Sequence, residues 1–459
     1  MRKITYVILS TLLLGTNMLL AQTPKGSVLI QNATILTVTR GTLEESDVLV
    51  KDGIIEKIGK DLSAPKGVET IDASGKYLMP GIIDAHSHLA LDVINEATAP
   101  ITAQVAMADV VNPFDVGIYR ALAGGTTIAH GLHGSANAIG GQSITLKYRY
   151  GTDNPEDLFM KEAPRTIKFA LGENPTRVHG RGKNIQPRTR MGVEAIIRNG
   201  FAEAQQYKKA WEEYNAVKDK KNNKAIPPEY NLKLQTLADI LAGEIIIHCH
   251  SYRADEIYML INVCRDFGVD KLVFTHVNEG FKVAPELAKY TMGASVFSDW
   301  WAYKFEVYYS TAYNSAILLE NNVITSINSD SDELIRHLYH EAAKTQRYGG
   351  LTDDQALSLI TINPAKQLGI DQYVGSIEEG KQADLVIFNS HPLSVYAIPQ
   401  MTFVDGVKYF DINTDKNDQR LKVSPTEMVE PVYLQGEGES CMHGVEFFTN
   451  EEASFNHSH

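Results

Sequence analysis

Seven short apolar runs, each ending in or near a polar or potentially metal-binding residue, recur between residues 81 and 330. Helix-like sequence separates most of them, and this alternation favours βα units with a parallel sheet. In a barrel of such units, the carboxyl ends of the strands and the loops after them form the active face. We therefore expect an α/β fold with a (β/α)8 TIM-like barrel over residues 83–370. The seven runs are GIIDAHSH (81–88), GGTTIAHG (124–131), TIKFALG (166–172), EIIIHCH (244–250), KLVFTH (271–276), ASVFS (294–298) and VITSINSD (323–330).

Shorter β patterns lie on both sides of the expected barrel, at residues 22–82 and 371–412. Charged turns separate their apolar runs, and the Asp52-Gly53 and Asp405-Gly406 pairs are typical of β-hairpins. Because the two segments have the same style, we expect one discontinuous, small β-sandwich domain built from both ends of the chain. Residues 191–241 are largely helical in pattern, which we interpret as a helical excursion between two strands.

Composition excludes several classes of protein. Hydrophobic residues make up 44% and charged residues 22% of the chain, so a sizeable core is available and wholesale disorder is excluded. The 43 Lys and Arg residues against 56 Asp and Glu give a net charge of −13, so we expect a small-molecule substrate and no nucleic-acid partner. The three cysteines, Cys249, Cys264 and Cys441, are too few for a disulfide framework or a four-thiolate zinc site. Any metal must therefore be held by histidine and carboxylate groups.

The two ends of the chain differ from its body. Residues 1–21 have the pattern of a signal peptide, with Arg2 and Lys3 before a largely apolar stretch and Ala21 as a small residue at the cleavage point. An uncleaved membrane anchor is the alternative, but the stretch is short for a bilayer span and is interrupted by polar residues. We expect an exported protein, periplasmic or secreted, with no stable membrane span after processing. Residues 413–459 are polar and are expected to form an irregular C-terminal tail.

Four histidines and one aspartate stand where the expected strands end. His86 and His88 are two residues apart, so both imidazoles point to one face of an extended strand and form a two-point metal clasp. His248 and His276 close two later runs, although histidines of a buried core would look the same. Asp330 closes the last run, where a carboxylate is costly to bury without a cation or hydrogen bonds. A helix N-cap is the alternative role for Asp330, but it leaves the other strand ends unexplained.

These features resemble the metal-dependent amidohydrolase superfamily, in particular its branch of imidazolonepropionase-like and secreted amidohydrolases. The resemblance covers nearly all of the mature chain to about residue 412. It rests on the segments YLMPGIIDAHSHLA, ALAGGTTIAHG, GSANAIGGQ, KFALGENP, IIIHCHSYRADEI, VFTHVNEG, SINSD and LITINPAKQLGI with GSIEEGKQADLVIF. It implies that the metal ligands include His86, His88, His248, His276 and Asp330. The motifs are specific for fold and metal chemistry and much less specific for the substrate.

The family also uses a carboxylated lysine or a glutamate as a ligand that bridges two metals. Both residue types occur in the segment IKFALGENP, as Lys168 and Glu173. Glu173 stands where the strand is expected to end, which is where a barrel places its ligands, whereas Lys168 lies earlier. We therefore favour Glu173 as the sixth ligand, which resembles the glutamate of the amino-sugar-phosphate deacetylases, with carboxylated Lys168 as the alternative.

Imidazole nitrogens and carboxylate oxygens suit a divalent cation, with zinc the expected identity, at one or two per chain. Such a cation lowers the pKa of a bound water from about 15.7 toward 7 and polarises a carbonyl. By analogy with the family, Asp330 is the catalytic general base and acid, which takes the water's proton and passes it to the leaving nitrogen. The implied activity is hydrolysis of a carbon–nitrogen bond in a small amide or cyclic amide, such as an N-acyl amino acid or a dipeptide. A lactonase or esterase, and a noncatalytic binding scaffold, are the alternatives.

Four further residues are candidates for contact with the substrate. His250 follows His248 by two residues and can share its face, although capping of the strand end is an equal alternative. Arg253 is suited to a bidentate bond with a substrate carboxylate, or is a surface charge at a helix start. Asn137 and Gln142 belong to the glycine-rich segment GSANAIGGQ, which the resemblance places near the substrate pocket. Family members commonly associate, so a homo-oligomer is also expected.

Overall fold

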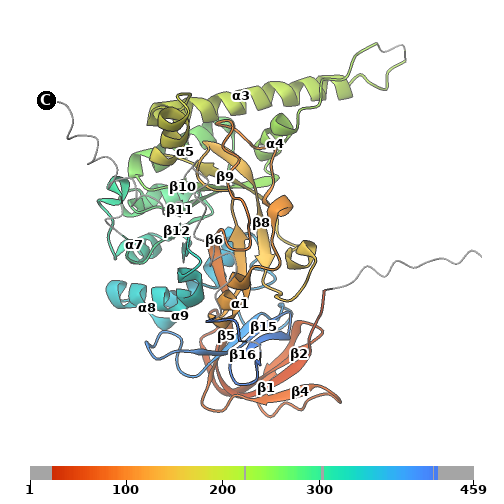
Figure 1. The fold of residues 1–459 in the computed structure, drawn as a ribbon, viewed down its shortest axis with the longest axis vertical. Coiled ribbons are helices and arrows are strands. Elements are labelled where there is room, and N and C mark those ends of the chain that lie inside the picture. The colour runs from red at the N-terminus through yellow and green to blue at the C-terminus, as the bar shows by residue number, and fades with distance from the viewer. Residues whose placement is uncertain (1–22, 222–223, 301–303, 417, 422–459) are drawn as a thin grey trace, which may run out of the picture.

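Two eight-stranded sheets form the framework of the protein in this computed structural model, which describes residues 23–221, 224–300, 304–416 and 418–421. Figure 1 shows strands from both ends of the chain gathered at one end of the molecule, with the second sheet and its helices above them. The expected signal peptide and most of the expected tail lie outside the described residues.

The first sheet joins strands from both ends of the chain. Its order is β16-β15-β14-β5-β1-β2-β3, and β4 pairs with β1 beside this path. At its centre β5 pairs antiparallel with β14, with Leu78 opposite Ile387, so residues far apart in the sequence meet. The two predicted β segments therefore share one hydrogen-bonded sheet, whereas their separation as a sandwich domain stays a prediction. The strands are β1 (Val28–Leu36), β2 (Thr42–Lys51), β3 (Ile54–Gly59), β4 (Glu69–Asp72), β5 (Tyr77–Pro80), β14 (Leu385–Phe388), β15 (Pro399–Val404) and β16 (Val407–Asp411).

Both predicted Asp-Gly hairpins are confirmed in this sheet. β2 and β3 pair antiparallel across Asp52-Gly53, and β15 and β16 pair antiparallel across Asp405-Gly406. In each pair the aspartate has φ of 49°, and the two glycines have φ of 80° and 73°. Positive φ at both central residues is what a two-residue type I′ turn requires, and the Asp-Gly sequence adopts it readily.

The second sheet is nearly closed into a barrel. Its strands follow one another in chain order from β6 to β13, and they are parallel except for β8, which is antiparallel to β7 and β9. The first and last strands meet at their carboxyl ends, where the Asp330 amide donates to the His86 carbonyl at 3.1 Å. The strands are β6 (Ile82–Ser87), β7 (Thr126–Gly131), β8 (Ile139–Lys147), β9 (Arg165–Ala170), β10 (Ile245–Ser251), β11 (Leu272–His276), β12 (Gly293–Val296) and β13 (Thr325–Ile327).

All seven predicted runs form strands of this second sheet, and β8 is the strand that the sequence analysis missed. Its Gly140-Gly141 pair indicated a ligand loop, because glycine is uncommon inside strands. The glycines are required here by close packing. A Cβ at Gly140 would lie 2.7 Å from His133 Nδ1, and one at Gly141 would lie 2.7 Å from Val105 Cγ2. The α/β expectation is therefore met by a barrel-like sheet with one antiparallel member.

Helices cover the outside of the second sheet, and the long α3 extends past its edge (Figure 1). Thr189 caps α3 by accepting from the Gly192 amide, and Asn231 caps α4 by accepting from the Leu234 amide. These two helices confirm the helical excursion predicted between β9 and β10. The α-helices are α1 (Val116–Ala123), α2 (Glu173–Pro175), α3 (Arg190–Asn215), α4 (Leu232–Leu241), α5 (Ala254–Phe267), α6 (Ala284–Tyr290), α7 (Asn314–Glu320), α8 (Leu338–Gly349), α9 (Asp353–Ser358) and α10 (Ile362–Gln367). The shorter helical turns are η1 (Met107–Val110), η2 (Pro155–Leu158), η3 (Thr176–Gly182), η4 (Gly280–Lys282), η5 (Phe305–Val307) and η6 (Leu334–His337).

The largest apolar cluster packs the outer faces of the second sheet's strands against these helices. Phe169 of β9 contacts Phe201 of α3, with ring centroids 6.0 Å apart, and Leu260 of α5 belongs to the same fully buried group. Alternation along β9 therefore sends Phe169 outward and its neighbour Lys168 inward. Among the described residues, no helix has both the length and the apolar character that a membrane span needs.

Candidate metal centre and active site

Five predicted ligands lie together at the carboxyl ends of the second sheet's strands, and we call them the ligand cluster: His86, His88, His248, His276 and Asp330. Asp330 Oδ1 lies 3.5 Å from His86 Nε2 and 3.3 Å from His88 Nε2, and its Oδ2 lies 3.5 Å from His276 Nε2. Donor atoms of His86, His88 and Asp330 all lie within 4.8 Å of one another. The spacing in sequence and the strand ends together therefore produce a compact set of metal-ligating groups.

His248 joins the cluster through the register of neighbouring strands. In the parallel pair β9 and β10, His248 is opposite Lys168, and partners of this kind direct their side chains to the same face. Lys168 Nζ lies 3.1 Å from His86 Nε2, which places it at the centre of the cluster. His130 packs behind His248 with ring centroids 4.3 Å apart, and its Nε2 contacts Thr166 Oγ1 at 2.8 Å.

The buried histidines keep nitrogen atoms without protein partners. Among the described residues, Nδ1 of His86 and both ring nitrogens of His248 and His276 have no hydrogen-bond partner, although all three side chains are fully buried. Buried polar atoms are nearly always paired, so unpaired ones call for an explanation. Imidazole nitrogen is a ligand of zinc and of other borderline cations, so these donors fit a divalent metal.

Burial also sets the ionisation that a metal needs. Burial, together with the positive charge of Lys168, holds the pKa of His86 well below its usual value, and burial lowers the pKa of His276 to about 3. Burial works against ionisation of Asp330, but the close contact with His88 and the charges of His276 and Lys168 outweigh this, so the pKa of its carboxyl lies below its usual value. At neutral pH the site therefore offers neutral imidazoles and an ionised carboxylate, which are the forms that bind metals.

Hydrogen bonds fix the orientation of the paired histidines and of the last strand. His88 Nδ1 contacts the Leu132 carbonyl at 2.9 Å, which makes Nδ1 the donor and turns Nε2 toward Asp330. Asp84 accepts from the His86 amide at 3.2 Å and from the Ser329 amide at 3.0 Å, so it ties the end of β6 to the segment after β13. These bonds hold the two ends of the barrel-like sheet in register at the site.

Two members of the ligand cluster have left-handed backbone conformations. The φ angle is 76° at His276 and 46° at Asp330. Residues with side chains seldom adopt such angles, and those that do are concentrated at functional sites where the surrounding structure enforces them. The alternative role of Asp330 as a helix cap is taken by Ser331, whose hydroxyl accepts from the amides of Glu333 and Leu334. Asp330 thus belongs to the cluster.

Glu173 does not occupy the position that we expected of the sixth ligand. Its carboxylate pairs with Arg177 at 2.9 Å, one turn further along the chain, and remains partly exposed. β9 ends at Ala170, and Gly172 with φ of 76° turns the chain before Glu173 is reached. Lys168, which lies on the strand itself, is fully buried beside His86. The structure therefore places Lys168, and not Glu173, beside the ligand cluster.

Two of the predicted substrate contacts have structural partners instead. The Asn137 amide group donates to the carbonyls of Glu96 and Ala99 at 3.0 and 2.6 Å, so it fastens the segment between β6 and α1. Gln142 accepts from the Arg165 guanidinium at 2.9 Å, at the amino end of β9 and away from the ligand cluster. The structure does not bring either side chain to the cluster.

The other two predicted substrate contacts differ from each other. His250 is fully buried, and its ring lies 4.9 Å from the ring of His276, so the structure brings it to the edge of the ligand cluster. Arg253 stands at the start of α5, where it binds Asp255 with two bonds of 3.0 Å and remains partly exposed. Arg253 therefore occupies the position expected of the alternative, a surface charge at a helix start.

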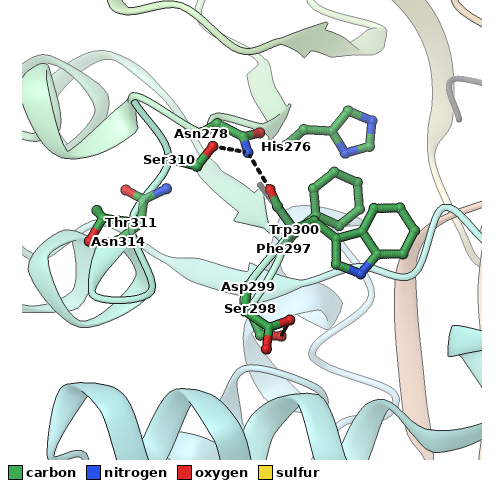
Figure 2. A pocket seen from close by; sticks show the side chains of 9 residues that line it. All are labelled: His276, Asn278, Phe297, Ser298, Asp299, Trp300, Ser310, Thr311 and Asn314. Atoms are coloured by element: carbon green, nitrogen blue, oxygen red, sulfur yellow. Dashed lines mark hydrogen bonds between the residues drawn. The ribbon is translucent and has the colours of Figure 1, made fainter. Parts of the chain in front are cut away.

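The sequence analysis did not identify a small pocket beside His276. Figure 2 shows Phe297 stacked between His276 and Trp300, and ring centroids along this stack are 4.7 and 4.5 Å apart. Asn278 lies opposite and donates to Ser310 Oγ at 2.7 Å. The pocket thus has an aromatic wall and a polar wall next to one of the ligands. Its residues come from separate loops, so no local sequence signal marks it.

Comparison with known proteins gives similar sequences and a similar solved structure. A sequence model of the amidohydrolase family matches residues 309–422. The crystal structure of an amidohydrolase from Thermotoga maritima has a TM-score of 0.77 and 34% identity, and the match covers 84% of this chain and 100% of that chain. Amidohydrolase tasK of Hapsidospora irregularis is 31% identical over 395 residues, which is 80% of this chain and 40% of that protein. The dihydroorotase of Pelobacter propionicus is 43% identical over 63 residues, which is 14% of this chain and 15% of that protein. The chain therefore spans less than half the length of these two relatives.

Proposed function

Because this chain belongs to the amidohydrolase family, we propose that it is a metal-dependent hydrolase that cleaves a carbon–nitrogen bond in a small amide or cyclic amide. The proposed substrates include N-acyl amino acids and dipeptides. The observation that supports this most strongly is the ligand cluster, in which buried neutral imidazoles surround an ionised carboxylate at the carboxyl ends of the strands. A protein that used this sheet only as a scaffold would have no need of such costly groups.

The residues that would hold the metal are the five of the ligand cluster, and carboxylated Lys168 would be the sixth ligand. An ammonium group at Lys168 Nζ would repel a divalent cation, because it lies 3.1 Å from a ligating imidazole. Reaction of the neutral amine with carbon dioxide forms a carbamate and releases a proton, and it replaces the positive charge with a negative one. A carbamate at Lys168 would offer oxygen ligands of the kind that divalent cations accept, with zinc the expected identity.

When bound, the metal supplies a Lewis acid for the scissile carbonyl and lowers the pKa of a water molecule. The chain's own contribution is to hold and move the proton. The Asp330 carboxylate is ionised and lies within 3.5 Å of three imidazoles, so it is placed to accept a proton and to return it to the leaving nitrogen. The small pocket beside His276 lies next to the ligand cluster, on the side where we propose that the substrate enters.

Export to the periplasm or the medium, and assembly as a homo-oligomer, also belong to the proposal. The signal-like residues 1–21 support export. Membrane fractionation of the full chain, N-terminal sequencing of the mature product and sedimentation analysis measure these properties directly.

The test combines metal analysis with two matched substrate panels. We expect about two divalent ions per chain in protein purified without chelator or histidine tag, and higher kcat/KM on amides than on matched esters and lactones. About one ion per chain would favour a mononuclear site. Higher kcat/KM on esters would favour the lactonase or esterase alternative, and absence of both metal and turnover after reconstitution would favour the binding scaffold.

A further inference from the structure

A buried lysine lies beside the ligand cluster without being part of it. Lys304 is 6% exposed, and it follows β12 on the same side of the sheet as the loops after β9 and β10. An ammonium group has three donors and is costly to bury unless charges or hydrogen bonds compensate it. Among the described residues, Lys304 donates one hydrogen bond, to Asn174 Oδ1 at 3.1 Å. The side chain therefore retains donor capacity at a buried position.

The contacts of Lys304 lead directly to the ligand cluster. Asn174 also approaches His250, with 3.4 Å between Asn174 Nδ2 and His250 Nε2. Lys304 Nζ lies 4.1 Å from the centre of the Tyr252 ring, and that ring stacks on His276 with centroids 5.7 Å apart. Lys304 is thus one side chain away from two histidines of the active face, through Asn174 to His250 and through Tyr252 to His276.

The nearby carboxylates have their own positive partner. Glu306 Oε1 accepts from Arg190 at 2.6 Å and from the Glu173 amide at 2.9 Å, whereas its Oε2 is 3.7 Å from Lys304. Glu256 also pairs with Arg190, and burial, with the charge of Glu306, raises its pKa to about 7. Near neutral pH the two carboxyl groups therefore hold less than two full negative charges, and Arg190 offsets one of them. The positive charge of Lys304 is therefore only partly balanced by its protein neighbours, and it can bind an anionic group of a ligand.

We propose that Lys304, positioned by Asn174, binds a carboxylate of the substrate, so that the enzyme acts on amides that carry an acid group next to the scissile bond. This inference rests on the proposed function and narrows its substrate class to N-acyl amino acids and dipeptides. It also moves the carboxylate contact from Arg253, which is bound to Asp255 on the surface, to a buried cation beside His250. A charge-assisted hydrogen bond at a buried position is the stronger determinant of specificity.

The test measures kcat/KM for N-acetyl-L-alanine, N-acetyl-L-leucine and N-acetyl-L-phenylalanine, each beside its C-terminal carboxamide. We expect the wild-type enzyme to prefer the carboxylates by about 10- to 100-fold, which is the usual contribution of a hydrogen bond to a charged group. Lys304→Met should remove this preference, mainly through KM, with metal content unchanged. Lys304→Arg should keep part of it. Lys289→Met, which changes an exposed lysine of α6, should keep all of it.

A second variant covers the case in which Lys304→Met does not fold. Asn174→Asp places a carboxylate against the ammonium, so the ratio of kcat/KM on acids to kcat/KM on carboxamides should again fall toward one. Equal hydrolysis of acids and carboxamides by the wild type, or an unchanged preference in a folded variant at either position, would overturn the assignment of Lys304 alone. No hydrolysis of any substrate in the panel, or of other small amides, would instead overturn the proposed function on which it rests.

Discussion

Two buried groups of polar side chains differ in the way the protein satisfies them. One is the ion cluster, defined as Lys147, Arg149, Asp384 and Asp405, which joins the two sheets. Lys147 Nζ donates to Asp384 at 3.0 Å and to Asp405 at 2.8 Å. Arg149 binds the second oxygen of Asp405 with two nitrogens at 2.9 and 2.6 Å. Each cation of this cluster therefore has a carboxylate partner within the protein.

The ligand cluster is arranged in the opposite way. The ring nitrogens of His248 and His276 have no hydrogen-bond partner among the described residues, and Lys168 faces the His86 imidazole. An unsatisfied buried polar group costs about 1–3 kcal/mol, so a fold retains several of them only where they serve a ligand. The difference indicates that the ion cluster stabilises the contact between the sheets and that the ligand cluster is built for binding and chemistry.

The largest effect on activity is expected at the carboxylate of the ligand cluster. Asp330→Asn keeps the shape of the side chain and the histidine ligands, but it removes the group that accepts and returns a proton. We expect kcat to fall by about 100- to 10,000-fold with metal content retained. Steady-state kinetics and elemental analysis of the same preparation measure both quantities. Retention of most of the wild-type kcat would show that the proton is moved by another group.

The ion cluster should respond in stability instead of activity. Asp405→Asn removes the charge partner of the buried Arg149 and one of the two carboxylates that pair with Lys147, and breaking a buried pair typically costs about 3–5 kcal/mol. Denaturant unfolding should show this loss, while kcat of the folded fraction stays near the wild-type value. Glu56→Gln is the matched control, since its ion pair with Lys51 is exposed and should contribute less than about 1 kcal/mol.

The contribution of Asp405 to stability should depend on pH. Burial works against ionisation of Asp405, but Lys147 and Arg149 outweigh it, so its pKa lies well below its usual value. Its stabilisation is therefore present above the unfolded pKa near 4 and is lost as the pH falls toward the folded value. The wild-type protein should lose stability below about pH 4 more steeply than Asp405→Asn. Equal slopes for the two proteins would mean that the charge of Asp405 does not stabilise the sheet contact.

The sequence predicted the strands that carry the ligands because each combines an apolar, mostly β-branched run with a polar end. It did not predict β8, whose Gly140-Gly141 pair is required by packing against His133 and Val105. Strand pairing also lies beyond local pattern. The segment Ile139–Lys147 mixes apolar, polar and glycine residues, and nothing in it indicates a strand that runs antiparallel to both neighbours.

The positions of Lys168 and Glu173 also depend on the fold and not on local pattern alone. Strand-end reasoning favoured Glu173, but the turn at Gly172 carries it away from the cluster, where it pairs with Arg177. A usable signal was present in the run TIKFALG, because a lysine inside an apolar strand is costly unless it is functional. Lys304 and Asn174 had no such signal, since only the fold brings their loops together.

Substitution of Lys168 is expected to have the next largest effect on activity, and substitution of Glu173 is expected to have none. Lys168→Met should lower metal affinity by at least about 10- to 100-fold, because loss of even an outer partner of a metal ligand has that effect. Activity should fall in proportion. Glu173→Gln is the matched control and should keep metal content and kcat/KM, since Glu173 contacts Arg177 instead of the cluster. Metal loss in Glu173→Gln, with Lys168→Met unaffected, would restore the original choice.

The smallest effect is expected at the exposed cation that the sequence offered for substrate binding. Arg253 pairs with Asp255 two residues away, and since Arg253 is partly exposed and Asp255 is exposed, solvent screening limits the pair to less than about 1 kcal/mol. Arg253→Met should therefore leave stability, kcat/KM and the preference for acid substrates close to wild type, as measured on the panel used for Lys304. A large loss of that preference would mean that Arg253 leaves Asp255 when substrate binds, and that an exposed loop supplies the carboxylate contact. If Arg253→Met keeps the preference for acid substrates and Lys304→Met loses it, a buried cation determines the substrate specificity. Specificity and metal binding would then both depend on buried polar groups that the fold leaves available for a ligand.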